Sequence, residues 1–393
     1  MFYVFTASVC FAQDLKSNEL FEIPLQVNDV LPAVHKNIDI KNNVDCFDKT
    51  NRTFFEEIIK SIPKDEDCVD ISKPKYLLDD VTTKYFERGP LSDFHSGLVY
   101  RGAVNFNFLQ QGPSSIDTDY FILENNFTGN FKDGKTSFTL GTRYVPQARY
   151  TFFQFLPADA FITHKFDKHT KILFGSSRTH TGEDGSLTNL LVPFINYSQI
   201  GRTFGNTRKF GVSLIGDYDL FEYDLGGFSS DTYYQKFFPG GEFTGWLTFK
   251  PLGKTDGRYG KLNLSGGVSS GKNDSSYTVA GGFASYEYKK FKMDFEMSDA
   301  DGYNGAHGIS TNHARGYYSS VYCRLNNKLQ LLARYDAFQP NVDVSSKNIT
   351  EYVCGINYFI KGQALRLILN YVYRQNDFGK DSHRIILGTQ ILL

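Results

Sequence analysis

The chain has 393 residues, including 36 Phe, 25 Tyr and 35 Gly but only 3 Met and 1 Trp. Aromatic residues make up 16% of it, yet its mean hydropathy is −0.34, which indicates that apolar and polar residues alternate. The longest mostly apolar stretch is the first 12 residues, whereas a membrane-spanning helix needs about 20, so a helical membrane protein is excluded. A hydrophobic fraction of 41% with a net charge of −1 argues against disorder.

The first predicted element is an export signal at residues 1–12, with cleavage before Gln13. The stretch is apolar and ends in the small residue Ala12, but no Lys or Arg precedes it. The signal is therefore incomplete at its basic end, and a buried first strand is the alternative. Export is the context that we expect for the rest of the chain.

Residues 13–95 are predicted to form an acidic, partly helical or irregular extension. Between residues 14 and 95 there are 17 acidic and 11 basic residues, whereas residues 96–393 hold 26 acidic and 31 basic residues. Pro63 is expected to end a short helix in this extension. Cys46 and Cys68 flank that helix and are the candidate disulfide, since an exported chain allows one.

From residue 96 onward the hydrophobic period is two. In FKMDFEMS, residues 291–298, Phe and Met alternate with charged or small polar residues, which sorts them onto the two faces of a strand. Cys323 and Cys354 fall at apolar positions of this pattern and are expected to act as small hydrophobic residues. The pattern predicts sixteen strands, at 97–108, 118–131, 135–144, 157–166, 170–178, 207–216, 220–228, 241–250, 259–269, 275–288, 290–299, 315–325, 328–338, 349–360, 364–375 and 382–393.

The connections between these strands are alternately short and long. The longest ones are predicted at 179–206, 300–314 and 339–348, whereas 251–258 is long where a short turn is expected. Alternating connections with an even number of strands are typical of a transmembrane barrel with periplasmic turns and outer loops. The predicted fold is therefore all-β: a 16-stranded antiparallel transmembrane β-barrel at residues 96–393, with a soluble all-β fold as the alternative.

Residues 96–393 resemble bacterial outer-membrane porins, and among them the phosphate-selective porin family. The resemblance rests on RKFGVSLIGDYDLFEYDLGGF, GEFTGWLTFKPLG followed by YGKLNLSGGVSSG, and QALRLILNYVYRQN. It implies a homotrimer in outer-membrane lipid that passes small ions or phosphate. It also implies a third outer loop that folds inward, and the third long connection, 179–206, is the longest at 28 residues.

Two sets of residues are candidates for this channel. The candidate pore-lining bases, on the polar face of the strands, are Arg101, Arg143, Lys165, Lys209, Lys261, Lys292, Lys328, Arg334, Arg366, Arg374 and Arg384. Acidic residues share that face, which favours a general diffusion pore over an anion-selective one. The candidate constriction residues are Arg178, Glu183, Asp184, Arg202 and Arg208, which either set a field across the pore or only keep the loop soluble.

Other motifs do not indicate chemistry. GVSSG, residues 267–271, lies between two strands rather than at the strand-to-helix turn of a nucleophile elbow, and DADGYNG, residues 299–305, lacks the later Glu of a calcium loop. No metal, cofactor, catalytic or nucleic-acid site is expected. The predicted function is passive diffusion of small hydrophilic solutes through an outer-membrane porin, with a preference for anions such as phosphate. The alternatives are a barrel hydrolase and a structural or adhesive barrel whose extension binds periplasmic partners.

Overall fold

The computed structural model describes residues 90–109, 113–145, 154–232, 236, 238–255, 257–305, 308–344, 348–377 and 379–393. The predicted signal at 1–12, most of the extension at 13–95 and the candidate disulfide between Cys46 and Cys68 lie outside these residues. Among the described residues, no helix combines the length and apolarity that a membrane crossing needs.

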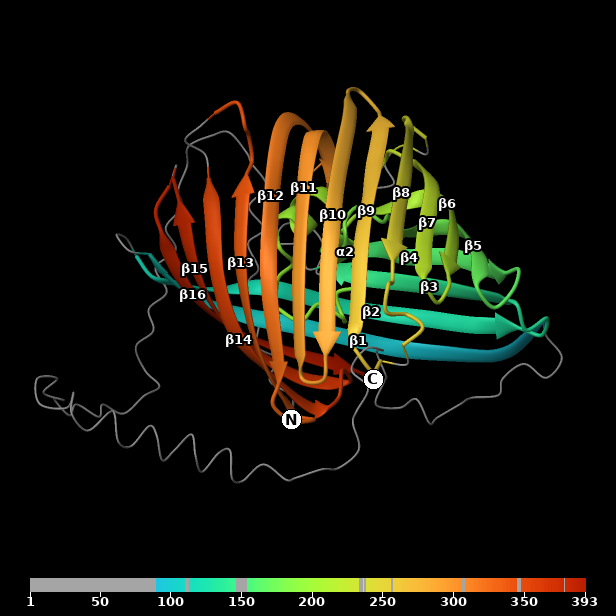
Figure 1. Cartoon of the computed structure of the whole chain (residues 1–393), viewed down its shortest axis with the longest axis horizontal. Coiled ribbons are helices and arrows are strands. Elements are labelled where there is room, and N and C mark those ends of the chain that lie inside the picture. The colour runs from blue at the N-terminus through green and yellow to red at the C-terminus, as the bar shows by residue number, and fades with distance from the viewer. Residues whose placement is uncertain are drawn as a thin grey trace, which may run out of the picture. The chain divides into compact units, whose positions relative to one another are not determined.

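Sixteen antiparallel strands form a closed barrel in which each strand pairs with its sequence neighbours and β1 pairs with β16 (Figure 1). The predicted fold class is thereby confirmed for the barrel. The strands are β1 (Leu91–Leu109), β2 (Ser115–Phe131), β3 (Thr136–Val145), β4 (Gln154–Lys165), β5 (Thr170–Arg178), β6 (Arg208–Asp217), β7 (Phe221–Ser229), β8 (Gly241–Phe249), β9 (Lys261–Lys272), β10 (Ser276–Tyr288), β11 (Phe291–Gly305), β12 (Gly308–Arg324), β13 (Leu329–Gln339), β14 (Ile349–Lys361), β15 (Leu365–Asn376) and β16 (Ser382–Leu392).

The prediction of an outer loop at residues 300–314 is wrong. Strand β11 continues to Gly305 and β12 begins at Gly308, with one register shift between Asp301 and Tyr303. Polar residues in this stretch suggested a loop, but the side chains of Asp299 and His313 lie 2.9 Å apart across the two strands. The polar residues therefore lie in the part of this hairpin that extends beyond the apolar band, and they do not mark the ends of its strands.

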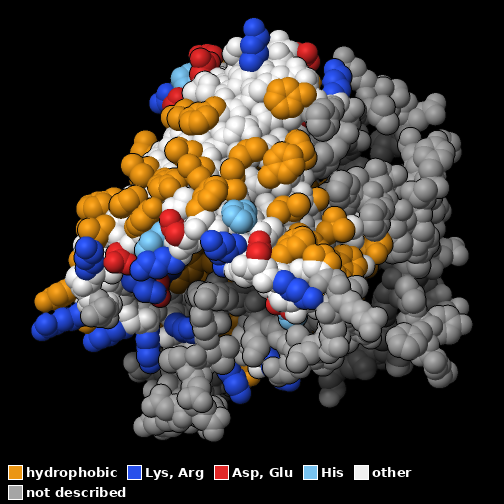
Figure 2. Space-filling view, turned by 90° about the vertical axis from the view of Figure 1, so that its right-hand side faces the viewer, with side chains coloured by type: hydrophobic (Ala, Val, Ile, Leu, Met, Phe, Trp, Pro, Cys, Tyr) orange, Lys and Arg blue, Asp and Glu red, His pale blue; other side chains and the backbone are white. Residues whose placement is uncertain are grey.

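The barrel is apolar outside and polar inside. On β11, Met293 and Met297 are 55% and 54% exposed, whereas Asp294 and Glu296 between them are 7% and 1% exposed. A soluble protein buries the apolar set instead, so this inversion indicates that the outer face contacts lipid. Figure 2 shows one such face, on which hydrophobic side chains cover a wide area and charged ones gather toward its edges. Cys323 on β12 and Cys354 on β14 are free thiols.

A row of aromatic rings crosses the outer face at one level from β12 to β16. Ring centroids are 5.8 Å apart for Tyr317 and Tyr335, 5.3 Å for Tyr335 and Tyr352, and 6.0 Å for Tyr352 and Tyr373. The hydroxyl of Tyr373 donates to Asp381 in the loop between β15 and β16. Amphipathic rings of this kind form the girdles of membrane barrels where hydrocarbon meets water, so this row marks the outer boundary of the apolar band.

Candidate functional site: the lumen and its inserted loop

Residues 179–206, which join β5 to β6, fold into the barrel and are called the inserted loop here. They include two short helices, α2 (Glu183–Ser186) and α3 (Gln199–Phe204). Figure 1 shows α2 behind the front strands β9–β11. The loop packs through apolar side chains that a solvent-exposed loop would not bury: Phe194, Ile195 and Ile200 are each 2% exposed. Its apolar packing therefore fixes it to the barrel wall.

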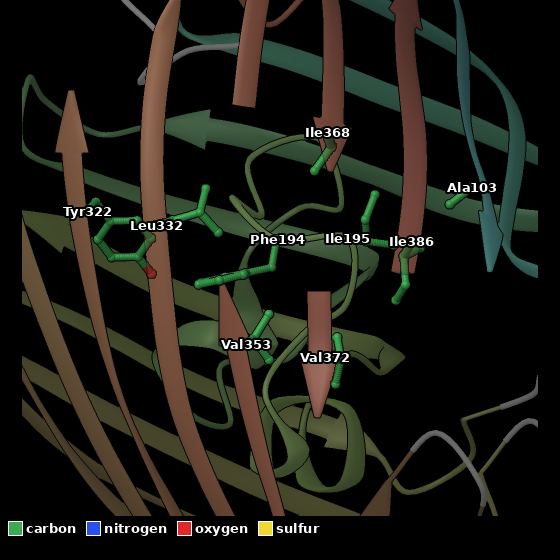
Figure 3. Close-up of a cluster of buried hydrophobic side chains, with 9 residues drawn as sticks. All are labelled: Ala103, Phe194, Ile195, Tyr322, Leu332, Val353, Ile368, Val372 and Ile386. Carbon is green, nitrogen blue, oxygen red and sulfur yellow. The ribbon is translucent and has the colours of Figure 1, made fainter. Parts of the chain in front are cut away.

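The contacts of the loop lie on one side of the lumen. Phe194 and Ile195 lie among inward side chains of β1 and β12–β16, as Figure 3 shows. Ile200 and Phe204 pack against β10–β14, and Leu190 packs against β1, β16 and the turn before β15. We call β10–β16 and β1 the covered wall and β2–β9 the open wall. The covered wall carries the hydrophobic core of the molecule, which lies inside the barrel.

Buried arginines of the covered wall bind the backbone of the loop. Arg101 donates to the carbonyl oxygen of Phe194 at 2.6 Å and is also 3.4 Å from that of Val192. Arg366 donates to Val192 at 3.1 Å, and Arg334 donates to the carbonyl of Asn196 at 3.2 Å. The guanidinium is suited to this role because it carries five donors in a rigid plane. These three arginines therefore satisfy carbonyls that would otherwise be buried without donors.

Carboxylates of the covered wall bind the amide ends of the two helices. Glu296 accepts hydrogen bonds from the backbone N–H groups of Glu183 at 2.9 Å and Asp184 at 3.1 Å, and from the hydroxyl of Tyr318. Asp336 accepts the N–H of Gln199, the first residue of α3, at 2.8 Å. The first N–H groups of a helix have no partner within it and attract negative charge. Wall acids and wall bases thus match the polarity of the loop backbone.

Two glycines permit this close docking. Gly182 has a φ of +84°, and a Cβ there would lie 2.4 Å from a carboxylate oxygen of Glu296. Gly305 on β11 faces α3, where a Cβ would lie 1.7 Å from the carbonyl oxygen of Thr203. Both positions therefore exclude a side chain, since each one would force the loop off the wall.

The structure places the candidate pore-lining bases in several different settings. Four are buried: Arg101, Arg334 and Arg366 bind the loop, while Lys209 pairs with the buried Glu242. These four face the lumen side of the wall but not open water, because the loop or an ion pair covers them. Arg143 donates to Glu124 at 2.8 Å on the open wall. Lys328 is exposed in the turn before β13, and Lys165, Lys261 and Lys292 line cavities described below.

The remaining two bases join the loop in a cluster of three arginines around one carboxylate. Glu351 on β14 is 1% exposed, and its Oε1 lies 3.0 Å from Arg202 of α3 and 3.1 Å from Arg384 of β16. Arg374 of β15 lies 3.9 Å from the same oxygen. The cluster lies toward the outer ends of β14–β16 and carries more positive than negative charge.

Glu183 and Asp184, the two candidate acids of the loop, line one of the cavities described below together with Lys261 and Lys292 of the wall. Glu183 accepts the indole N–H of Trp246 at 2.8 Å, and Asp184 accepts the backbone N–H of Ser198 at 2.6 Å. Among the described residues, Arg202 of the loop forms an ion pair with Glu351 of the covered wall. In this pair the base is on the loop and the acid is on the wall. A field across the pore therefore stays a prediction, with charges of both signs on the loop.

Arg178 and Arg208 lie on the open wall, where they are register partners on β5 and β6. Arg208 donates to Asp159 of β4 at 2.7 Å, and Arg178 donates to Asn189 of the loop at 3.2 Å. Together with Arg143 and its partner, they form a row of charges of both signs on β2–β6. This row faces the lumen without the apolar cover that the other wall has.

Three adjoining cavities lie at the turn side of the lumen, with volumes of about 380, 400 and 450 Å³. The first two share Glu183, the first and third share Asp217, and the last two share Lys261. All three have charged linings, and polar cavities of this size hold water. A hydrated, charged space therefore remains beside and beneath the inserted loop.

Turn residues at the same side show how local hydrogen bonds fix the short connections. Asp133 accepts backbone N–H groups of Lys135 at 2.9 Å and Thr136 at 2.8 Å, and it also accepts the hydroxyl of Thr136. These bonds favour the ionised form and hold the pKa of Asp133 at about 2, below its ordinary 3.8. The turn between β2 and β3 is thereby held by a charged side chain.

The sequence matches no family model and no curated protein. The anion-selective porin from Comamonas acidovorans has a similar structure, with 12% identity and a TM-score of 0.59 over 77% of this chain and 99% of that one. The outer membrane channel DcaP of Acinetobacter baumannii gives 13% and 0.56 over 77% and 97%. OmpT of Vibrio cholerae, in its trimer form, gives 11% and 0.50 over 76% and 99%.

At these identities the likeness shows a shared fold. The closed barrel and its apolar outer face agree with that likeness, because a surface of this kind is stable only against lipid. Antiparallel barrels with short turns on one side and longer loops on the other belong to bacterial outer membranes. The chain is therefore an outer-membrane β-barrel protein with the fold of the porins.

Proposed function

We propose that this protein is a passive porin, through which small hydrophilic solutes diffuse down their gradients. The observation that carries the proposal is the inserted loop, which is fixed to the covered wall and leaves charged cavities on its turn side. A loop held in this way narrows a lumen without moving during transport. The proposal assigns no catalytic step to the barrel and makes the protein a channel rather than an enzyme.

Planar-bilayer recording of the refolded protein tests this role. We expect stepwise openings, and we expect a larger conductance when residues 187–197 are replaced by a short Gly-Ser linker. The native chain refolded in parallel is the control. A barrel that shows no openings in either form would overturn the proposal in favour of a structural barrel.

We also propose a preference for anions such as phosphate, supported by the arginine cluster around Glu351. Arg202 and Arg384 both approach one oxygen of the Glu351 carboxylate. Arg374 lies 3.9 Å from the same oxygen, which is too far for a hydrogen bond. A guanidinium with unused donors binds oxyanions well. The mixed charges of the turn-side cavities limit this preference, because they offer both signs to a passing ion.

Reversal potentials in a salt gradient measure this preference. Arg374→Gln is expected to shift the reversal potential toward cations and to weaken any block of the current by added phosphate. Lys328→Gln removes the same charge from an exposed turn and serves as the matched control. Equal shifts in both variants would mean that the cluster has no particular role.

Barrels in outer membranes commonly form oligomers. We propose that this protein forms a homotrimer in outer-membrane lipid. The trimer form of Vibrio cholerae OmpT, which shares the fold, supports this proposal. Chemical cross-linking of the protein in native membranes should give a band at three times the mass of the chain. A band pattern that ends at the single chain would contradict it.

A further inference from the structure

The second of the three cavities, of about 400 Å³, lies between the inserted loop and the inward faces of β9–β12. Wall residues of β9–β12 form one side of it, and residues between Glu183 and Pro193 of the loop form the other. None of the contacts that dock the loop fills this space. Its size is within the range of cavities that enclose small organic ligands.

Charges of both signs alternate across the wall of this cavity. Lys261 on β9 is the register partner of Glu287 on β10, and Glu287 is the partner of Lys292 on β11. The ammonium group of Lys292 lies 2.9 Å from Oδ2 of Asp294, whereas Lys261 forms no ion pair among the described residues. A cation that is not ion-paired and an anion therefore both line this cavity.

Asp294 has an acceptor that the described protein groups do not use. The residue is 7% exposed, and its Oδ1 is buried without a hydrogen-bond partner among the described residues. A buried carboxylate oxygen without a donor costs free energy, so a donor supplied by a solute is favoured. An ammonium group is suited to this position because it brings three donors and the opposite charge.

The lining also includes an apolar part, beside the polar residues Glu183, Asp184, Asn263 and Ser285. Leu187, Leu191 and Pro193 of the loop face this cavity, and Phe283 and Tyr322 of the wall complete the apolar part. The cavity thus combines an acceptor for an ammonium group, a free ammonium for a carboxylate, and a hydrophobic surface. Inorganic ions use only one of these three features.

We propose that this cavity is a binding subsite for a small zwitterionic amine with an apolar side chain, such as leucine. The ammonium group of the ligand donates to Asp294, its carboxylate approaches Lys261, and its side chain packs against Leu187 and Leu191. The inference names a solute class for the porin proposed above and rests on that function for its meaning in transport. The binding itself depends only on the cavity.

Binding to the protein in detergent micelles, followed by saturation-transfer NMR or calorimetry, tests the subsite. The probes are leucine, 3-methylbutylamine, which lacks the carboxylate, and 4-methylpentanoate, which lacks the amine. Because each lost charge-assisted hydrogen bond weakens binding by about tenfold or more, leucine should bind at least about tenfold more tightly than either analogue. Equal affinities for the three probes would overturn the proposal.

Two variants assign the charges to residues. Asp294→Asn should reduce leucine to the affinity of 4-methylpentanoate, and Lys261→Gln should reduce it to that of 3-methylbutylamine. Asp224→Asn makes the same charge change in the neighbouring cavity and should leave leucine binding unchanged. If Asp224→Asn and Asp294→Asn weaken leucine equally, the effect is one of general lumen charge and the subsite is refuted.

The design separates this inference from the porin proposal. Lys261 is exposed, so Lys261→Gln is expected to fold even if Asp294→Asn does not. The change in gel mobility on heating verifies whether each variant is folded. A protein that binds leucine but never conducts would overturn the porin proposal and leave the subsite. A protein that conducts but binds the three probes equally would overturn the subsite alone.

Discussion

The two walls of the barrel use the same kinds of residue for different ends. On the covered wall, Arg101 and Arg366 are 2% and 1% exposed and donate to loop carbonyls. On the open wall, Arg143 and Arg208 pair with acids of β2 and β4, and their side chains are 23% and 12% exposed. An inward arginine therefore does not by itself indicate a pore charge. Whether a loop covers it decides whether it docks backbone or acts on ions.

The largest effect is expected from Phe194→Ala on the covered wall. Removing a buried aromatic ring costs about 3–5 kcal/mol in a packed core, which should detach the middle of the loop. The single tryptophan, Trp246, reports this directly because its indole N–H bonds Glu183 of the loop. We expect a shifted fluorescence maximum and an earlier urea midpoint. Phe291→Ala, at a 64% exposed outward position, is the control and should change neither.

A smaller effect is expected from Arg101→Met. The loop carbonyls of Phe194 and Ile195 would lose a buried donor, and each such loss costs about 1–3 kcal/mol. Single-channel records should show added current noise, because the loop is then held less firmly. Arg143→Met on the open wall is the matched variant and should leave the noise unchanged. If the two variants behave alike, the distinction between the walls is wrong.

Arg208→Gln should affect selectivity more than stability. The variant removes the partner of Asp159, whose side chain is 25% exposed, so the row on the open wall loses one positive charge. We expect a reversal potential shifted toward cations and a smaller loss of unfolding free energy than in Phe194→Ala. Trp246 fluorescence should stay the same. A large fluorescence change would show that the open wall also holds the loop.

The smallest effect is expected from Asp133→Asn, which lies outside both walls in the turn between β2 and β3. The pKa of Asp133 is lowered in the folded state to about 2, chiefly by hydrogen bonds from Thr136. Its contribution is therefore present above the unfolded value near 4 and is lost as the pH falls toward about 2. The protection factor of the Thr136 amide against hydrogen exchange, measured relative to the intrinsic rate at each pH, should fall over that window. The variant should show the low protection factor at every pH.

The strand pattern was predictable because one face of each strand contacts lipid. The alternation at Phe291, Met293 and Phe295 is a property of neighbouring residues and needs no knowledge of the partner strand. The end of the hairpin at Gly305 was not predictable in this way. Beyond the apolar band the outward side chains, such as Asp299 and Asp301, are polar, so the sequence no longer alternates between apolar and polar residues while the pairing continues.

The path of the inserted loop was suggested by its length, but its docking could not be predicted. Glu296 and Asp336 were visible as acids on the inward face, yet their partners are backbone N–H groups more than 100 residues away in sequence. Ser198, which caps α3 by accepting the N–H of Gly201, gave the only local signal. Residue types alone do not show which carbonyl or amide a side chain will reach.

Because the wall arginines and acids bind main-chain atoms, this polar part of the anchor does not depend on which side chains the loop carries, in contrast to the apolar packing of residues such as Phe194. Every residue except proline supplies the same amide and carbonyl. Loop side chains that take no part in the apolar packing can then change without loss of these backbone contacts. A barrel built in this way is able to acquire a new permeability by point substitution, and its aperture can diversify faster than the scaffold that holds it.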